Sequence, residues 1–215
     1  MAAQQGNNMS VFQAKQSGFP AGLRWAALLW LVIWVAVYWH AWGAANFMHL
    51  CDIAVILTSI GLWTNSRLLI SSQAVAALVA NLAWAFAAGW RLILGRPLVG
   101  GMEYLFDTRY PLWLRLMSLY HLVVPALLLW ALHRTGYDRR AWGLQSAIAL
   151  PVFIASRFAS PVENVNFAFT DPVFHRAWAP APAYLAVIFL VMVFAAYLPT
   201  HLLLKHLFSP PKGDG

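Results

Sequence analysis

Long apolar runs, broken by short polar stretches, fill most of the chain. A helix needs about 20 mainly apolar residues to cross the hydrocarbon core of a bilayer. Six runs reach or approach that length, and they cover residues 22–42, 46–64, 68–90, 112–133, 141–157 and 183–207. The fifth run is the shortest and contains Pro151, so we expect a kink or an added segment there.

This pattern predicts an all-α fold, a polytopic transmembrane helical bundle of about six spans. Residues 22–207 form a single bundle domain in this interpretation. Residues 1–21 are expected to be a mobile N-terminal tail, and residues 208–215 a C-terminal tail. The N-terminal stretch lacks the basic segment and the apolar core of a cleavable secretory signal.

Two connections between the runs are much longer than the others. Residues 91–111 and residues 158–182 are interrupted by proline and glycine and are rich in polar and aromatic side chains. Long connections carry function more often than tight turns do. With six spans, both of these loops would lie on the same side of the membrane.

Lysine and arginine predict which side that is, because cytoplasmic loops carry an excess of them. With the N-terminus inside, the inner side holds Lys15, Arg24, Arg67, Arg134, Arg139, Arg140, Lys205 and Lys212. The outer side holds Arg91, Arg96, Arg109, Arg115, Arg157 and Arg176. This asymmetry favours both termini inside (N-in/C-in) and both long loops outside.

The composition also favours a membrane protein. Of the 215 residues, 61% are hydrophobic and 10% are charged, and the mean hydropathy is +0.64. A soluble domain is nearer 45–50% apolar and about 25% charged. We interpret the net charge of +7 as basic residues that face anionic lipid headgroups, so no nucleic-acid partner is expected. The excess of arginine over lysine indicates a GC-rich bacterial genome, and hence the inner cell membrane.

Ionisable side chains are rare inside membrane spans, so those present here are candidates for function. His49, Cys51 and Asp52 lie together in the second run. His121 in the fourth run and Asn81 in the third are expected at similar depths, near the middle of the bilayer. Polar groups from three spans would then meet at one level.

Helical geometry limits which of these groups can touch. Residues three apart share a face, so His49 and Asp52 are expected to be neighbours. Cys51 lies two positions, or about 200°, from His49 and should not meet it directly. A base for the thiol would therefore come from another span, and His121 is the candidate.

Other interpretations of these residues stay open. A single membrane cysteine is often a small packing residue, and polar groups such as Ser118, Tyr120 and His121 can tie helices together. The chain has one cysteine, which excludes an internal disulfide and a cysteine-based structural zinc site. His49, Asp52 and His121 could ligate a metal, but they lack a typical metal-site spacing. We expect no metal and no other cofactor.

Three short motifs follow one another along the chain: His-Leu-Cys at 49–51, Ser-Leu-Tyr-His at 118–121 and NVNFAF at 164–169. In order and spacing they resemble the YwaF family of integral membrane proteins, whose animal relatives include a membrane cysteine acyltransferase that remodels phospholipids. The resemblance implies a helical bundle with a nucleophilic thiol at Cys51 and a histidine partner at His121. The family's usual Gly-x-Asn-Tyr is replaced here by NVNFAF, and Asp52 follows the cysteine.

The first function that follows is a lipid acyltransferase or hydrolase, with membrane lipids as partners. Cys51 would attack an acyl carbonyl, His121 would take and return the proton, and His49 and Asp52 would orient the reacting groups. The residues expected to bind the substrate are Asn81, Asn164, Asn166 and Arg115.

The alternative is a non-catalytic accessory or assembly subunit of a larger membrane complex. The polar residues would then form a buried hydrogen-bonded network, and the partners would be other membrane subunits. Transport is less favoured, because the sequence has neither evident repeats nor paired broken helices.

Overall fold

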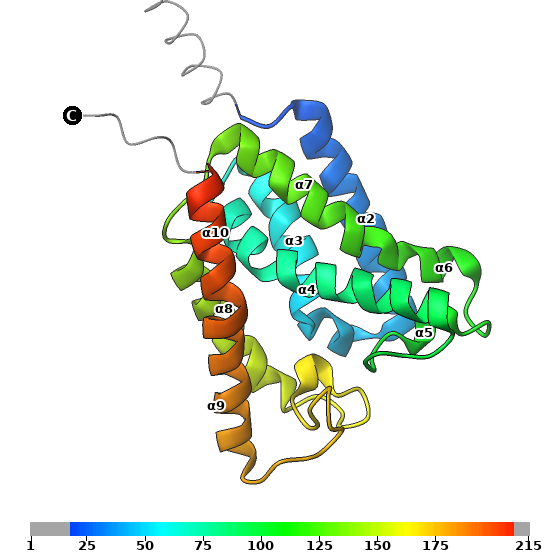
Figure 1. Cartoon of the computed structure of the whole chain (residues 1–215). Helices are drawn as coiled ribbons and strands as arrows, with labels where there is room; N and C mark the ends of the chain where they lie inside the picture. The colour runs from blue at the N-terminus through cyan, green and yellow to red at the C-terminus, as the bar shows by residue number, and fades with distance from the viewer. Residues whose placement is uncertain (1–17, 209–215) are drawn as a thin grey trace, which may run out of the picture.

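The computed structural model describes residues 18–208, which fold into helices joined by turns and loops, with no β-strand in that range (Figure 1). Most of the expected N-terminal tail and nearly all of the C-terminal tail lie outside the described residues. In chain order the elements are α2 (Ala21–Trp42), η1 (Ala44–Met48), α3 (Leu50–Trp63), α4 (Arg67–Leu94), α5 (Glu103–Phe106), α6 (Leu112–Leu116), η2 (Met117–Leu119), α7 (Tyr120–Thr135), α8 (Ala141–Ser156), η3 (Val165–Phe167), α9 (Ala181–Val191), η4 (Met192–Tyr197) and α10 (Leu198–Phe208).

Four helical stretches of the described chain are long and apolar enough to cross a membrane: Ala21–Trp42, Arg67–Leu94, Leu112–Thr135 and Ala181–Phe208. They coincide with the first, third, fourth and sixth predicted spans. The second and fifth predicted spans are α3 and α8, apolar helices of 14 and 16 residues. The all-α fold is therefore confirmed for the described residues, and four helices long and apolar enough to cross a membrane are compatible with a multi-pass protein.

Helix α4 lies at the centre of the bundle, between α3, α7 and α8 (Figure 1). Its buried face carries many small side chains, which let neighbouring helices approach closely. These are Ser71, Ser72, Ala74, Ala76, Ala77 and Ala87. Helix α2 packs on α3, and the continuous rod α9–η4–α10 packs against α8 and α4.

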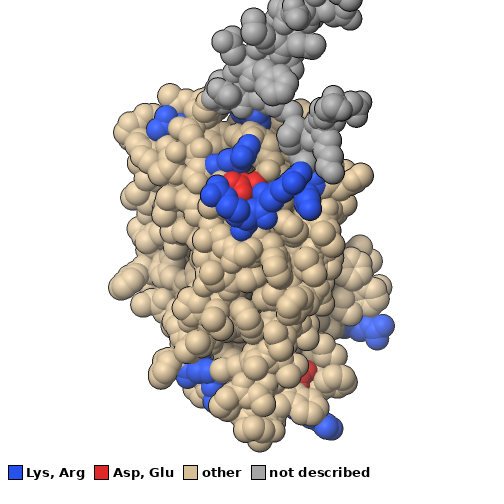
Figure 2. Space-filling model, turned by 90° about the vertical axis from the view of Figure 1, so that its left-hand side faces the viewer, with Lys and Arg blue, Asp and Glu red and all other residues tan. Residues whose placement is uncertain are grey.

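The outward faces of the helices are apolar. Large exposed side chains occur on all of the long helices, for example Trp25 on α2, Phe86 on α4 and Val187 on α9. Figure 2 shows basic side chains gathered around an acidic one near one end of the molecule, others towards the opposite end, and a band without charged side chains between them. This is the surface expected of helices that face lipid.

One segment of the α9–α10 rod departs from the α-helix. Residues Met192–Tyr197 are π-helical, and such wide turns leave backbone groups without their usual helical partners. The indole Nε1 of Trp142 on α8 donates a hydrogen bond to the Val193 carbonyl, 3.2 Å away. The wide turn is therefore held against α8 by a side chain.

The α7–α8 turn is organised by Asp138. Its carboxylate accepts hydrogen bonds from the backbone and guanidinium of Arg140, and Nη2 lies 2.9 Å from Oδ2. The Asp138 backbone N–H donates to Ser71 on α4. The side-chain hydrogen bonds from Arg140 lower the pKa of Asp138.

We expect Asp138→Asn to lower the free energy of unfolding at pH 7 by at most about 1 kcal/mol, because Arg140 is mostly exposed. A carboxylate with a lowered pKa stabilises the fold above the ordinary aspartate pKa of about 3.9, and this contribution is lost as the pH falls through the lowered value. Unfolding in detergent at pH 7 and near pH 3 measures this, and the difference from wild type should shrink at the lower pH. Asp107→Asn, in the exposed pair with Arg109, is the matched control and should have no measurable effect. An equal loss at both pH values would contradict the ionic origin.

Candidate functional site

The helix that carries Cys51 begins one residue before it. His49 is the N-cap of α3 in an extended conformation, and the helix proper starts at Leu50. We expected His49 and Asp52 to be neighbours on one helix face, which requires both residues to be helical, but His49 is not. The two side chains form no hydrogen bond in the described part of the chain. The His49 Nδ1 atom is buried without a hydrogen-bond partner.

Asp52 is the centre of a buried network, with an exposed fraction of 2%. Its Oδ2 accepts a hydrogen bond from the Asn46 amide, and its Oδ1 accepts one from the Tyr120 hydroxyl at 2.7 Å. The Cys51 Sγ lies 3.9 Å from the same Oδ1. One carboxyl group thereby joins η1, α3 and α7 beside the thiol.

His121 contacts the ring of Tyr120. Its ring is stacked between Trp84 and Tyr120, with centroids 4.3 and 4.1 Å away. Its Nδ1 is 2.9 Å from the Ser118 carbonyl, which can only accept, so this nitrogen carries a proton. Nε2 of the neutral ring is then the basic atom. No hydrogen bond joins the imidazole to Cys51 within residues 18–208.

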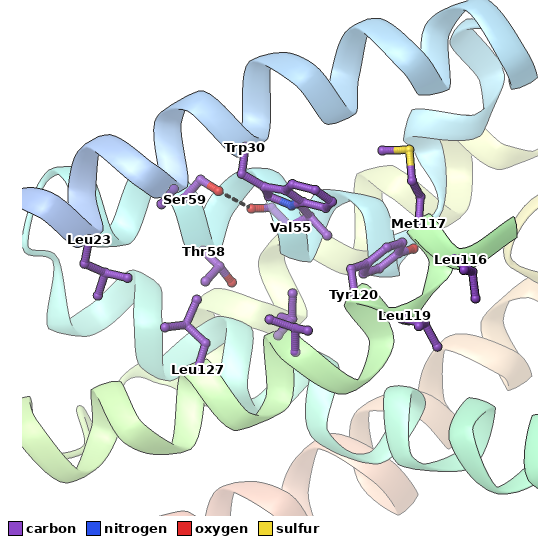
Figure 3. A pocket seen from close by; sticks show the side chains of 13 residues that line it. Leu23, Trp30, Val55, Thr58, Ser59, Leu116, Met117, Leu119, Tyr120 and Leu127 are labelled. Atoms are coloured by element: carbon purple, nitrogen blue, oxygen red, sulfur yellow. Dashed lines mark hydrogen bonds between the residues drawn. The ribbon is translucent and has the colours of Figure 1, made fainter. Parts of the chain in front are cut away.

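An apolar pocket of about 330 Å³ lies between α2, α3 and α7 (Figure 3). Trp30 contributes from α2, Val55 and Thr58 from α3, and Tyr120 from α7. Val55 and Thr58 follow Cys51 by four and seven positions, so the three residues share one side of the helix. The thiol lies one turn beyond the pocket wall, and the Tyr120 ring belongs to both the pocket and the polar network.

The polar atoms of this pocket are few. The Thr58 hydroxyl is buried without a partner, whereas Ser59 donates to the Val55 carbonyl at 3.0 Å, as the dashed line in Figure 3 marks. The other walls are aliphatic and aromatic. A pocket of this character suits a hydrocarbon chain.

Asn166, expected to bind substrate, ties the 158–182 loop to the helices. Its Oδ1 accepts from the Leu50 N–H at 3.0 Å, and its Nδ2 donates to the Met48 carbonyl and to Ser156 Oγ. It thereby caps the helix that carries Cys51 from a distant part of the sequence.

Asn164 also has a local role. Its amide group donates to the carbonyl and the hydroxyl of Thr170 and accepts from the N–H groups of Phe169 and Thr170. These four hydrogen bonds hold residues 164–170 in a closed turn and occupy both polar atoms of the Asn164 amide.

The two remaining expected binding residues retain unused polar atoms. Arg115 Nη1 is 3.4 Å from the Leu105 carbonyl, while its Nε is buried without a partner. Asn81 is 1% exposed, and neither atom of its amide has a partner. Asn81 lies one turn before Trp84 on α4, and therefore faces the same neighbouring helix as the residue that stacks on His121.

A second polar network was not anticipated. Gln73 on α4 donates to Ser72 Oγ at 3.0 Å and to the Gln145 side chain on α8 at 3.4 Å, and Gln145 donates to the Tyr197 hydroxyl. Two glutamines within apolar runs were the available signal, since uncharged amides in spans also seek partners. Asn46, three positions before His49, and Tyr120, next to His121, were likewise not assigned the bonds that they make to Asp52.

The described residues contain no group of three or more histidine, cysteine or acidic side chains that could hold a metal ion. Comparison of the chain with models of known families, with curated proteins and with solved structures finds no match.

Proposed function

We propose that this multi-pass membrane protein is a thiol-dependent lipid acyltransferase or hydrolase of the bacterial inner membrane. The observation that carries the proposal is the common side of α3 shared by Cys51 and the pocket residues Val55 and Thr58. A lipid acyl chain lying in this pocket would point its carbonyl end towards the thiol. Tyr120, which lines the pocket and binds Asp52, would separate hydrocarbon from the polar groups.

In the proposed reaction the Cys51 thiol gives its proton to a base, and the sulfur bonds to the acyl carbonyl carbon. The carbonyl oxygen carries the negative charge until the ester C–O bond breaks, and the leaving alkoxide takes the proton from the base. The acyl group remains on sulfur as a thioester. An acceptor alcohol or water gives its proton to the same base and attacks the carbonyl carbon, and the sulfur leaves as a thiolate that takes this proton back.

The base in this proposal is His121, whose Nδ1 proton is held by Ser118 and whose Nε2 is free to accept. Asp52, whose Oδ1 accepts a hydrogen bond from the thiol, would position the sulfur. Tyr120 bonds to Asp52 and stacks on His121, so it would keep the two groups in a fixed relation.

The proposal includes six crossings with both termini inside. Helices α3 and α8 are short for a full crossing, but each is continued at one end by structure that packs in the bundle: η1 precedes α3, and η3 packs against α8 and η1. Non-helical backbone is tolerated at membrane depth where protein surrounds it. Both long loops would then lie outside.

The test is labelling of the purified protein with a long-chain N-alkylmaleimide between pH 6 and 9, followed by mass spectrometry of the Cys51 peptide. We expect labelling near pH 7, and a loss of rate of roughly a hundredfold in His121→Ala, the lower end of a general-base contribution. Asp52→Asn reports separately on the positioning carboxylate. Labelling that needs alkaline pH in the wild type would refute an activated thiol.

A second substitution tests the pocket rather than the base. Ala27 lines the pocket on α2, and a tryptophan there would fill it. Ala27→Trp should slow the long-chain reagent while leaving the reaction with N-ethylmaleimide unchanged. Equal slowing of both reagents would show that the pocket does not guide the chain.

One observation favours the non-catalytic alternative, an accessory subunit of a membrane complex. Both oxygens of Asp52 are already engaged by Asn46 and Tyr120, as in a network that specifies helix packing. Copurification of stoichiometric membrane subunits, together with an unreactive Cys51, would support it.

A further inference from the structure

The segment 158–180, between α8 and α9, presents large apolar side chains away from the protein. Phe158 is 87% exposed, Val162 93% and Phe174 68%, and Val173 and Trp178 are exposed as well. Exposed apolar groups concentrated in one short stretch mark an interaction surface. We call this stretch the apolar loop.

The apolar loop has a fixed internal structure. Asp171 accepts hydrogen bonds from the backbone N–H groups of Val173, Phe174 and Arg176 and from the Trp178 indole. Tyr184 on α9 donates to the Phe167 carbonyl at 2.8 Å. These hydrogen bonds therefore fix the backbone that carries the exposed apolar side chains.

Arg157 secures the other end of the apolar loop. Its guanidinium donates to the Ala168 carbonyl at 3.0 Å and lies over the Phe169 ring, 4.2 Å from the centroid. Together with the bonds of Asn166 to the start of α3, this contact fixes the loop to the bundle.

The apolar loop is continuous with surfaces that face lipid. Phe158 closely follows α8, on which Ile154 is exposed, and Trp178 precedes α9, on which Leu190 is exposed. The exposed Arg176 lies between the aromatic residues. Aromatic side chains with a neighbouring arginine are typical of the layer where hydrocarbon meets phosphate.

From this continuity, rigidity and composition, we infer that the apolar loop lies in the headgroup layer of the bilayer, with Phe158, Val162 and Phe174 inserted among the lipids. It sits at the end of the molecule opposite the start of α2 and the end of α10 (Figure 1). Asn166 joins this loop to the first turn of α3. The inference rests on the membrane surface alone and is independent of any reaction at Cys51.

The test uses the full chain in lipid bilayers, with Cys51→Ser as background and a nitroxide label at Phe174→Cys or Val162→Cys. Collisions with oxygen, which concentrates in lipid, are compared with collisions with a water-soluble nickel complex. Leu190→Cys on α9 is the lipid-facing control, and Arg139→Cys, exposed at the opposite end, is the water-facing control. Because all of these positions are exposed, the variants should unfold at the temperature of the background protein.

We expect an oxygen-to-nickel accessibility ratio at both loop positions that exceeds Arg139→Cys several-fold and lies at or below that of Leu190→Cys, which is further along α9 and so deeper in the hydrocarbon. A ratio equal to that of Arg139→Cys would place the apolar loop in water and overturn the inference. Protection from both reagents would show that protein covers the loop, a partner subunit or a second copy, and would overturn it as well.

Discussion

Asp52→Leu is expected to lower the free energy of unfolding by about 2–4 kcal/mol, because it leaves two hydrogen-bond donors without acceptors in the interior. The Tyr120 hydroxyl and the Asn46 amide both bind this carboxylate, and Tyr120 is buried. Their bonds join η1 and α3 to α7, a contact across 68 positions of the sequence. Reversible unfolding in mixed detergent micelles gives the value.

Two further variants identify the cause of that loss. Asp52→Asn keeps an oxygen for Tyr120, and the Asn46 amide can turn to offer its own oxygen, so this change should cost much less. Tyr120→Phe combined with Asp52→Leu should cost less than the sum of the single changes, because both remove the same bond. A fully additive double mutant, or an Asp52→Leu protein as stable as wild type, would show that the network does not hold the helices together.

Asn166→Ala is expected to cost about 2–4 kcal/mol, since it removes the cap of α3 and two further hydrogen bonds and places alanine in the left-handed region. The backbone φ of Asn166 is +51°, a conformation that asparagine tolerates better than alanine. Trypsin cleavage after the exposed Arg176 should become faster in the same variant, because the 158–182 loop would open more often.

Asn166→Gly separates the two causes of that cost. Glycine adopts positive φ freely, so its remaining destabilisation measures the lost hydrogen bonds. Asn166→Asp keeps the acceptor for the Leu50 N–H and loses both donors. Unchanged cleavage at Arg176 in Asn166→Ala would mean that other contacts, such as that of Tyr184 with Phe167, are enough to hold the loop.

The long helices could be predicted from sequence because lipid imposes a simple length rule. The predicted spans 22–42 and 183–207 correspond to the helical stretches Ala21–Trp42 and Ala181–Phe208 of the structure. Hydropathy alone could not reveal that residues 46–49 leave the helix, because Phe47 and Met48 are as apolar as the residues of α3. That stretch forms a 3₁₀ turn whose following helix is capped by Asn166, a contact across 116 positions that no local pattern records.

The candidate site could be predicted from sequence only in part, because its contacts also join residues that are far apart in the chain. Polar residues in apolar runs directed attention to Cys51, Asp52 and His121, but their pairing depends on how helices rotate against one another. In the structure Asp52 accepts a hydrogen bond from Tyr120 rather than from a histidine. The adjacent His121 turns instead towards Trp84 on α4, since neighbouring residues on a helix point about 100° apart.

The π-helical segment sets the rotational register of the last membrane helix. On its N-terminal side Phe189 packs edge-to-face on Phe153, and on its C-terminal side His201 is hydrogen-bonded to the Tyr137 hydroxyl at 2.7 Å. A π-turn takes up more residues than an α-turn, so each half of the rod can present its own buried side to the bundle. Removing one residue between Met192 and Tyr197 would hardly change the apolar length of this span, yet it would rotate one half relative to the other by about 100°. The apolar length of the rod allows it to cross a membrane, and the π-helical turn orients each half of the rod towards its own packing partners.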